Sequence, residues 1–180
     1  MNAPTYHLWF KPSGDAYRIL MRTIRVLARE LNAPLFEPHI SLIGNLEGTE
    51  QEITQKSEEL ARQLEPFQAV LTKASYRDTH FQCLFMLVEE TPPLMKAHAV
   101  ATDFFHKPYQ PFMPHLSLVY GSYSEVEKKL VIEKLAADVR TSFEVTGLYL
   151  VRADSPEPKD WHEIGPFPMK QIHAAPQANQ

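Results

Sequence analysis

One eight-residue pattern occurs twice in this chain and limits the possible folds more than any other feature. The first copy is residues 36–43, FEPHISLI, and the second is residues 112–119, FMPHLSLV. Both read Phe-x-Pro-His-apolar-Ser-Leu-apolar. Alternate side chains of a β-strand point to opposite faces, so the His and the Ser of each copy share one face and the aliphatic residues take the other. Two core-anchored strands can therefore present matching polar faces to one site.

Each copy of the pattern pairs an imidazole with a hydroxyl, His39 with Ser41 and His115 with Ser117. An imidazole can move a proton near neutral pH, and a hydroxyl can donate a hydrogen bond to an oxyanion. A single His-x-Ser is a weak signal, because a lone His on a strand is usually structural. The frame of Phe, Pro, Leu and aliphatic residues around both copies favours a functional pair.

The repeat extends beyond the two motifs, which are 76 residues apart (115 − 39 = 76). The same offset relates Leu8 to Leu84, Trp9 to Phe85, Phe36 to Phe112, Phe67 to Phe143 and Asp78 to Asp154. This indicates duplication of a strand–helix–strand–helix–strand unit, with repeats at about 1–80 and 81–170. We expect one two-lobed α+β domain over 1–173 with pseudo-two-fold symmetry: two antiparallel sheets lining a central cleft, with helices outside. Residues 174–180 have no apolar period and are predicted to be disordered.

Hydrophobic periodicity and capping signals place the elements of each unit. Helices are predicted from about 15 to 31, 49 to 65, 92 to 105 and 124 to 136. Strands are predicted at about 6–10, 36–43, 67–74, 81–88, 112–119, 143–151 and 161–164. The helices starting near Thr49 and Ser124 each open with a capping box, Ser or Thr followed three residues later by Glu.

Composition narrows the possible partners. The chain has 180 residues, of which 44% are hydrophobic, and a formal net charge of −4. This is typical of a globular protein with no overall attraction to a polyphosphate, so we expect no long nucleic acid partner, whereas a small phosphorylated ligand is compatible. No stretch approaches the roughly 18 apolar residues of a membrane span, and the first residues lack a signal-peptide pattern. We expect a cytoplasmic monomer without a membrane partner.

The sequence offers no pattern typical of a metal or redox site. The only cysteine, Cys83, lies in an apolar run and is expected to be a small buried hydrophobe. No H-x-x-x-H, H-E-x-x-H or cysteine cluster occurs, so we expect neither a metal nor another cofactor. The remaining histidines lack a comparable context and are predicted to have surface or structural roles: His7, His80, His98, His106, His162 and His173.

The two H-x-S motifs resemble those of the 2H phosphoesterase superfamily. The surroundings, residues 114–120 (PHLSLVY), 6–9 (YHLW) and 81–83 (FQC), are similar to its cyclic phosphodiesterase branch. The resemblance implies a metal-independent enzyme that opens small cyclic phosphates. Its implied substrates are nucleoside 2′,3′-cyclic phosphates, opened to 2′-phosphates, and ADP-ribose 1″,2″-cyclic phosphate, opened to the 1″-phosphate.

The resemblance also implies roles for the motif residues. His39 and His115 would be the general acid and base, and Ser41 and Ser117 would donate hydrogen bonds to the non-bridging phosphate oxygens. This suits the reaction, which needs a deprotonated water, a protonated leaving alkoxide and donors around the phosphorus. The sequence does not tell which histidine is the acid.

Two aromatic residues and two other functions complete these expectations. By resemblance, Tyr120 would add a phosphate hydrogen bond, and Trp9 would stack on or shield the base or ribose.

One alternative is an RNA 2′,5′-ligase-like enzyme, although that branch usually continues its motif as H-x-T-L-x-F-L-G, unlike residues 43–46 (IGNL). The other alternative is a non-catalytic module that binds a nucleotide or an RNA end.

Overall fold

A computed structural model describes residues 3–135 and 137–170. Eight strands form one antiparallel sheet in the order β6-β3-β4-β5-β2-β1-β7-β8. The strands are β1 (Thr5–Phe10), β2 (Ile40–Leu46), β3 (Phe67–Tyr76), β4 (Leu84–Val88), β5 (His115–Val119), β6 (Ser142–Val145), β7 (Gly147–Ala153) and β8 (Trp161–Pro168). The helices are α1 (Gly14–Glu30), α2 (Glu50–Ala61), α3 (Pro92–Phe104) and α4 (Glu125–Lys134). The predicted tail, 174–180, lies outside the described residues.

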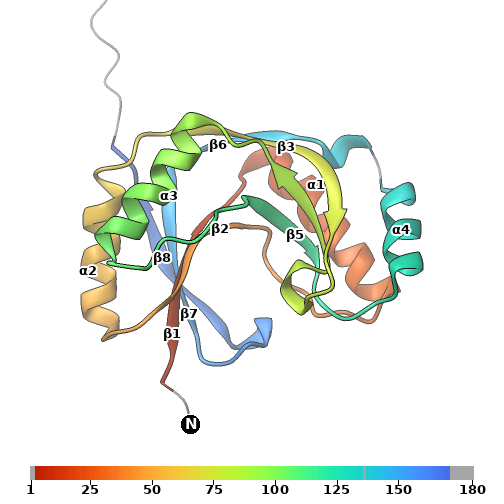
Figure 1. Cartoon of the computed structure of the whole chain (residues 1–180), viewed down its shortest axis with the longest axis horizontal. Helices are drawn as coiled ribbons and strands as arrows, with labels where there is room; N and C mark the ends of the chain where they lie inside the picture. The colour runs from red at the N-terminus through yellow and green to blue at the C-terminus, as the bar shows by residue number, and fades with distance from the viewer. Residues whose placement is uncertain (1–2, 136, 171–180) are drawn as a thin grey trace, which may run out of the picture.

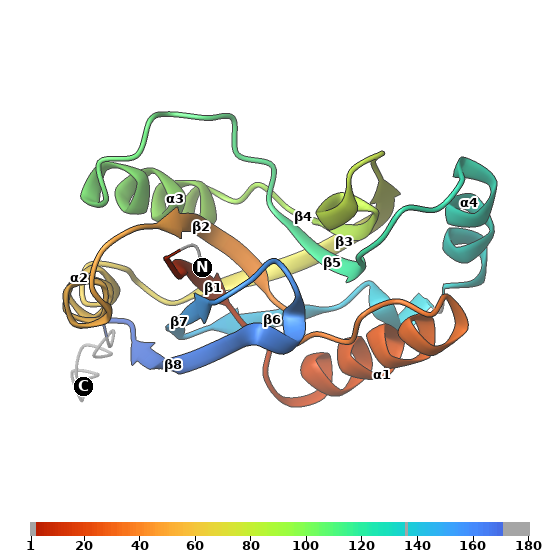
Figure 2. The same cartoon turned by 90° about the horizontal axis from the view of Figure 1, so that it is seen from below.

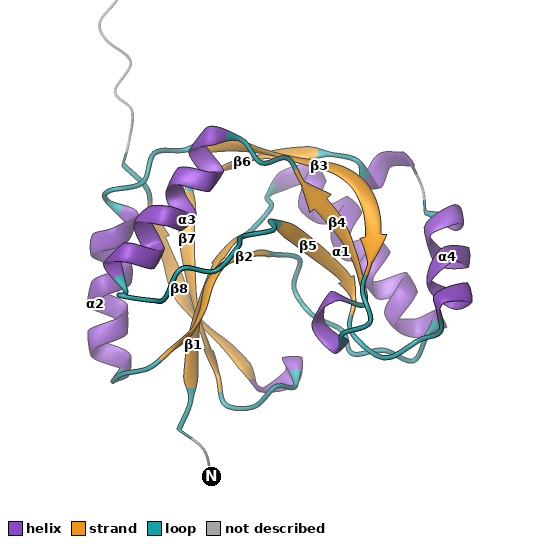
Figure 3. Ribbon diagram, in the orientation of Figure 1, coloured by secondary structure: helices purple, strands orange, loops and turns teal. Residues whose placement is uncertain are grey.

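The sheet has two matching halves, as the predicted α+β fold with pseudo-two-fold symmetry requires. The first half is β2-β1-β7-β8 and the second is β5-β4-β3-β6. They join where β2 meets β5, through the single pair Ile40 and Leu116. The two sheets that we expected are therefore halves of one curled sheet, joined at a narrow junction (Figures 1 and 3).

Each half contains strands from both repeats. Strand β3 belongs to the first repeat but pairs with β4, and β7 belongs to the second repeat but pairs with β1. The helices cross in the same way, because α1 packs on β5 and α3 on β2. Figure 2 shows α3 beside β2. Neither half is therefore built from one contiguous repeat.

The helices lie on the outer side of the curled sheet, α2 and α3 beside the first half and α1 and α4 beside the second (Figure 1). In β1, Leu8 and Phe10 are fully buried in the core, whereas His7 and Trp9 alternate with them and take the opposite face. The predicted capping boxes are both present, at Thr49 and Ser124. None of the described helices is long and apolar enough to span a bilayer.

Several strand boundaries differ from the sequence prediction: β4 and β5 begin three residues later than expected, at Leu84 and His115, and β8 continues to Pro168. The first motif strand begins at Ile40, later than expected, because Pro38 has no N–H for a ladder hydrogen bond and the chain before it runs as a loop. The strand expected at 143–151 is divided into β6 and β7 at Thr146. The division follows from the pairing, since β6 joins β3 in the second half and β7 joins β1 in the first.

Candidate active site

His39 is held in one orientation at the point where the chain enters β2. Its Nδ1 lies 2.7 Å from the carbonyl oxygen of Glu37. A carbonyl only accepts, so Nδ1 carries the proton and donates it, and Nε2 is left for another partner. The imidazole stacks on the indole of Trp9, with ring centroids 3.6 Å apart and planes 10° apart. Both rings are 5% exposed, so neighbouring groups hold this histidine on several sides.

The loop that carries His39 is tied to α1 and to the far edge of the first half. The hydroxyl of Tyr17, on α1, donates to the Glu37 carboxylate at 3.0 Å. The ammonium of Lys11 is 3.6 Å from the same carboxylate and 2.7 Å from that of Glu163 on β8. These contacts fix the carbonyl that orients His39.

His115 is held in the same way at the start of β5. Its Nδ1 donates to the carbonyl oxygen of Met113, 2.9 Å away, two residues earlier in the chain. The ring packs edge to face against Phe85 of β4, with centroids 5.1 Å apart. Trp9 and Phe85 are the pair that the 76-residue offset relates. Each histidine thus has a backbone acceptor and an aromatic support at corresponding positions.

Burial keeps the His39 imidazole neutral. It lowers the pKa of His39 to about 3, which the hydrogen bond to Glu37 opposes only in part. The ammonium of Lys11 lowers this pKa further, as do His7 and His115 when they are protonated, so His39 and His115 lie within electrostatic reach of each other.

The pKa of His115 is also lowered, mainly by burial. The Met113 carbonyl opposes this shift, and the positive charge of Arg77 adds to it. Both imidazoles are therefore neutral in the free protein near pH 7, with the same tautomer.

The two motif serines differ in their surroundings. Ser41 is exposed, lies opposite Trp9 on β1, and has no side-chain hydrogen bond within 3–135 and 137–170. Ser117 is 6% exposed and donates to the carbonyl oxygen of Phe81 at 3.1 Å. Phe81 belongs to the short helical turn η1 (His80–Gln82), which contacts β5. One hydroxyl is therefore free to meet a ligand, and the other is already engaged.

Tyr120 joins the frames of the two motifs. It is 3% exposed, and its ring stacks on Phe36 with centroids 3.9 Å apart. Burial raises the pKa of its phenol, and a hydrogen bond with Ser117 opposes this shift in part. The phenol therefore stays protonated and can act as a donor.

Trp161 is a residue of this site that the sequence did not single out. Its indole is edge-on to the indole of Trp9, with ring centroids 5.6 Å apart, and to the imidazole of His39, with centroids 6.2 Å apart. It is also edge-on to the Tyr120 ring, whose centroid is 5.9 Å away. Its Nε1 donates to the carbonyl of Ser155 at 3.0 Å. The sequence placed Trp161 at the start of a short strand, but only the fold brings the end of the β7–β8 connection to the histidines.

The structure gathers the predicted aromatic residues around the histidines, and their roles stay predictions. The proposed stacking of Trp9 on a base or ribose meets a geometric difficulty, because His39 covers one face of the indole and little of the ring is exposed. The described residues contain no cluster of three or more His, Cys, Asp or Glu side chains that could hold a metal ion.

Comparisons with known proteins agree on the family. Residues 12–157 match a family model described as the 2′-5′ RNA ligase superfamily. A curated cyclic phosphodiesterase of Arabidopsis thaliana is 30% identical over 130 residues, which are 72% of each chain.

Among solved structures, E. coli LigT in its apo form superposes with a TM-score of 0.66 at 12% identity, covering 94% of this chain and 100% of that one. E. coli LigT complexed with 3′-AMP gives a TM-score of 0.65 at 14% identity, with the same coverage. At these identities the likeness to LigT establishes the fold.

Proposed function

This chain belongs to the 2′-5′ RNA ligase superfamily, the 2H phosphoesterases, and its family supports a phosphodiesterase activity; from that premise we propose that its substrates are small cyclic phosphates. It would hydrolyse nucleoside 2′,3′-cyclic phosphates to 2′-phosphates and ADP-ribose 1″,2″-cyclic phosphate to the 1″-phosphate, without a metal. The likeness to a cyclic phosphodiesterase supports this choice of substrate.

One observation carries the proposed mechanism. His39 and His115 each donate from Nδ1 to a carbonyl two residues earlier, so both leave Nε2 for the reaction. One Nε2 would accept a proton from water as the water oxygen bonds to phosphorus. The other, protonated, would donate to the ribose oxygen as its bond to phosphorus breaks. The products are a ribose hydroxyl and a phosphate monoester.

Hydroxyl groups would stabilise the developing charge on the phosphate. Ser41 is free to donate to a non-bridging oxygen, whereas Ser117 would have to turn from the Phe81 carbonyl toward the phosphate. Tyr120, whose phenol remains protonated, would donate a hydrogen bond to the phosphate beside Ser117. An anionic substrate also raises the pKa of a nearby imidazole, which lets one histidine hold the proton that the mechanism needs.

The decisive experiment is hydrolysis of 2′,3′-cyclic AMP and ADP-ribose 1″,2″-cyclic phosphate in the presence of EDTA, with products identified by phosphorus NMR. We expect a 2′-phosphate and a 1″-phosphate. His39→Ala and His115→Ala should each lose ~10²–10⁴-fold in rate, the usual contribution of one general acid or base.

The matched control is His106→Asn. His106 is exposed and has a positive φ of 52°, a conformation that Asn tolerates. This variant should keep the wild-type rate. Near wild-type rates in both active-site variants would exclude the two-histidine mechanism.

A second candidate is hydrolysis or formation of 2′,5′-linked RNA, which the description of the family model favours. The net charge of −4 weighs against a long RNA substrate. Turnover of a 2′,5′-linked dinucleotide, without turnover of either cyclic phosphate, would establish this candidate instead.

A further inference from the structure

Arg77 places a guanidinium beside the loop that carries His115. The residue follows the end of β3, and its Nη2 lies 3.2 Å from the sulfur of Met113. Its Nη1 donates to the side-chain oxygen of Gln82 at 3.1 Å. Met113 also supplies the carbonyl that orients His115, so this cation lies at the edge of the candidate active site.

Arg77 differs from the cation near the other histidine. Lys11, whose charge reaches His39, is paired with the carboxylates of Glu163 and Glu37. Arg77, whose charge reaches His115, has no carboxylate partner in the described part of the chain, and its two side-chain contacts are with neutral groups. An exposed, unpaired guanidinium is available to an anionic ligand.

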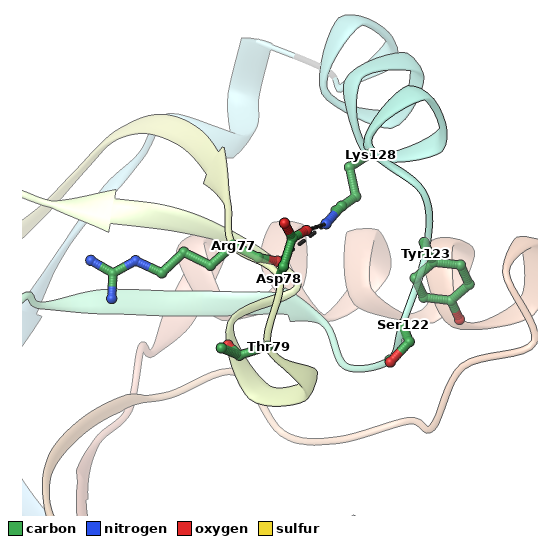
Figure 4. A pocket seen from close by; sticks show the side chains of 7 residues that line it. Arg77, Asp78, Thr79, Ser122, Tyr123 and Lys128 are labelled. Carbon is green, nitrogen blue, oxygen red and sulfur yellow. Dashed lines mark hydrogen bonds and ion pairs between the residues drawn. The ribbon is translucent and has the colours of Figure 1, made fainter.

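A cavity of about 300 Å³ adjoins Arg77. It is lined by Arg77, Asp78, Thr79, Gly121, Ser122, Tyr123 and Lys128 (Figure 4). The buried ammonium of Lys128 is paired with Asp78 at 2.5 Å, so their charges offset each other. In Figure 4 the Arg77 side chain points away from that pair and from Ser122 and Tyr123. Its guanidinium is therefore directed away from the cavity, and it contacts Met113 of the second motif.

We propose that Arg77 binds a second phosphate of the substrate, one outside the cyclic diester. This rests on the proposed function, because it assumes a cyclic phosphate at the two histidines. A guanidinium offers two parallel N–H donors that match the oxygens of a phosphate. Such a site favours ADP-ribose 1″,2″-cyclic phosphate, or a nucleoside 2′,3′-cyclic phosphate that carries a 5′-phosphate. It disfavours the nucleoside 2′,3′-cyclic phosphate that lacks the 5′-phosphate.

The test compares two substrates that differ only in that phosphate: adenosine 2′,3′-cyclic phosphate with and without a 5′-phosphate. Wild type should show a kcat/KM about 10-fold higher for the 5′-phosphorylated substrate, as expected for one exposed charge-assisted contact. Arg77→Ala should abolish this preference, and Arg77→Lys should keep part of it, because it retains the charge without the bidentate geometry. High salt should weaken the preference.

The control variant is Arg62→Ala, which removes an exposed arginine paired with Glu58 on α2. It should keep the wild-type preference. Equal kcat/KM values for the two substrates in wild type, or an unchanged preference in Arg77→Ala, would overturn the inference while leaving the cyclic phosphodiesterase activity in place.

If neither substrate were turned over, the proposed function would fail. Ligand-binding measurements would then test the second phosphate site at Arg77. Titration calorimetry would then compare adenosine 2′,5′-bisphosphate with 2′-AMP. Tighter binding of the bisphosphate that is lost in Arg77→Ala supports a second phosphate site. Equal affinities in wild type exclude it.

Discussion

The indole of Trp9 lies face to face with the imidazole of His39, with ring centroids 3.6 Å apart. Phe85 occupies the corresponding position beside His115, but packs edge to face. The two supports come from β1 and β4, strands that take matching places in the two halves of the sheet. This relationship suggests that Trp9 acts on the reaction by positioning His39.

We predict that Trp9→Ala lowers kcat about 10-fold or more, because His39 loses the surface that holds its ring. The loss should be similar for cyclic AMP and cyclic UMP, and Trp9→Phe should recover much of it. The acid limb of the kcat/KM profile should move to higher pH, since water would reach the imidazole and relieve the burial that lowers its pKa. A change mainly in KM that depends on the base would instead indicate that Trp9 stacks on the substrate.

The two serines should respond differently to removal of their hydroxyls. Ser41→Ala and Ser117→Ala should each lower kcat/KM by up to ~10²–10³-fold, as for one oxyanion donor. Ser117→Ala should also lower the free energy of unfolding by about 1 kcal/mol, because it leaves the carbonyl of Phe81 without its partner. Urea denaturation measures this difference, and equal stability losses in the two variants would contradict the hydrogen-bond assignment.

Acid should destabilise the protein through His39. Its pKa falls from 6.5 to about 3 on folding, so between these values the unfolded chain binds a proton that the folded protein excludes. The free energy of unfolding should therefore fall as the pH drops through this window, by up to ~1.4 kcal/mol per pH unit for this residue. Urea denaturation at several pH values should show a shallower dependence for His39→Gln than for wild type. An unchanged dependence would show that His39 does not carry this effect.

The pH–rate profiles should be bell-shaped, with apparent pKa values that belong to the histidine pair. The kcat/KM profile reports the free protein, in which burial lowers both imidazole pKa values. The kcat profile reports the complex, in which the bound phosphate raises them. We therefore expect the kcat profile to lie at higher pH. Coincident profiles would show that substrate binding does not change these pKa values.

Much of the fold and of the candidate site could be predicted from the sequence because the signals are local. Alternation within FEPHISLI and FMPHLSLV indicated which side chains share a face, and the boxes at Thr49 and Ser124 marked two helix starts correctly. These patterns depend on residues a few positions apart, so they can be read without knowing which strands pair. The double motif also indicated the family that the comparisons establish.

Only the tertiary structure decided how the two repeats combine. The exchange of β3 and β7 between the halves, the position of Trp161 and the unequal surroundings of Ser41 and Ser117 all depend on contacts between segments far apart in the chain. Such contacts are set by the packing of the whole sheet, and no local periodicity specifies them. The sequence thus determined which residues could react, whereas the fold determined what surrounds and orients each of them.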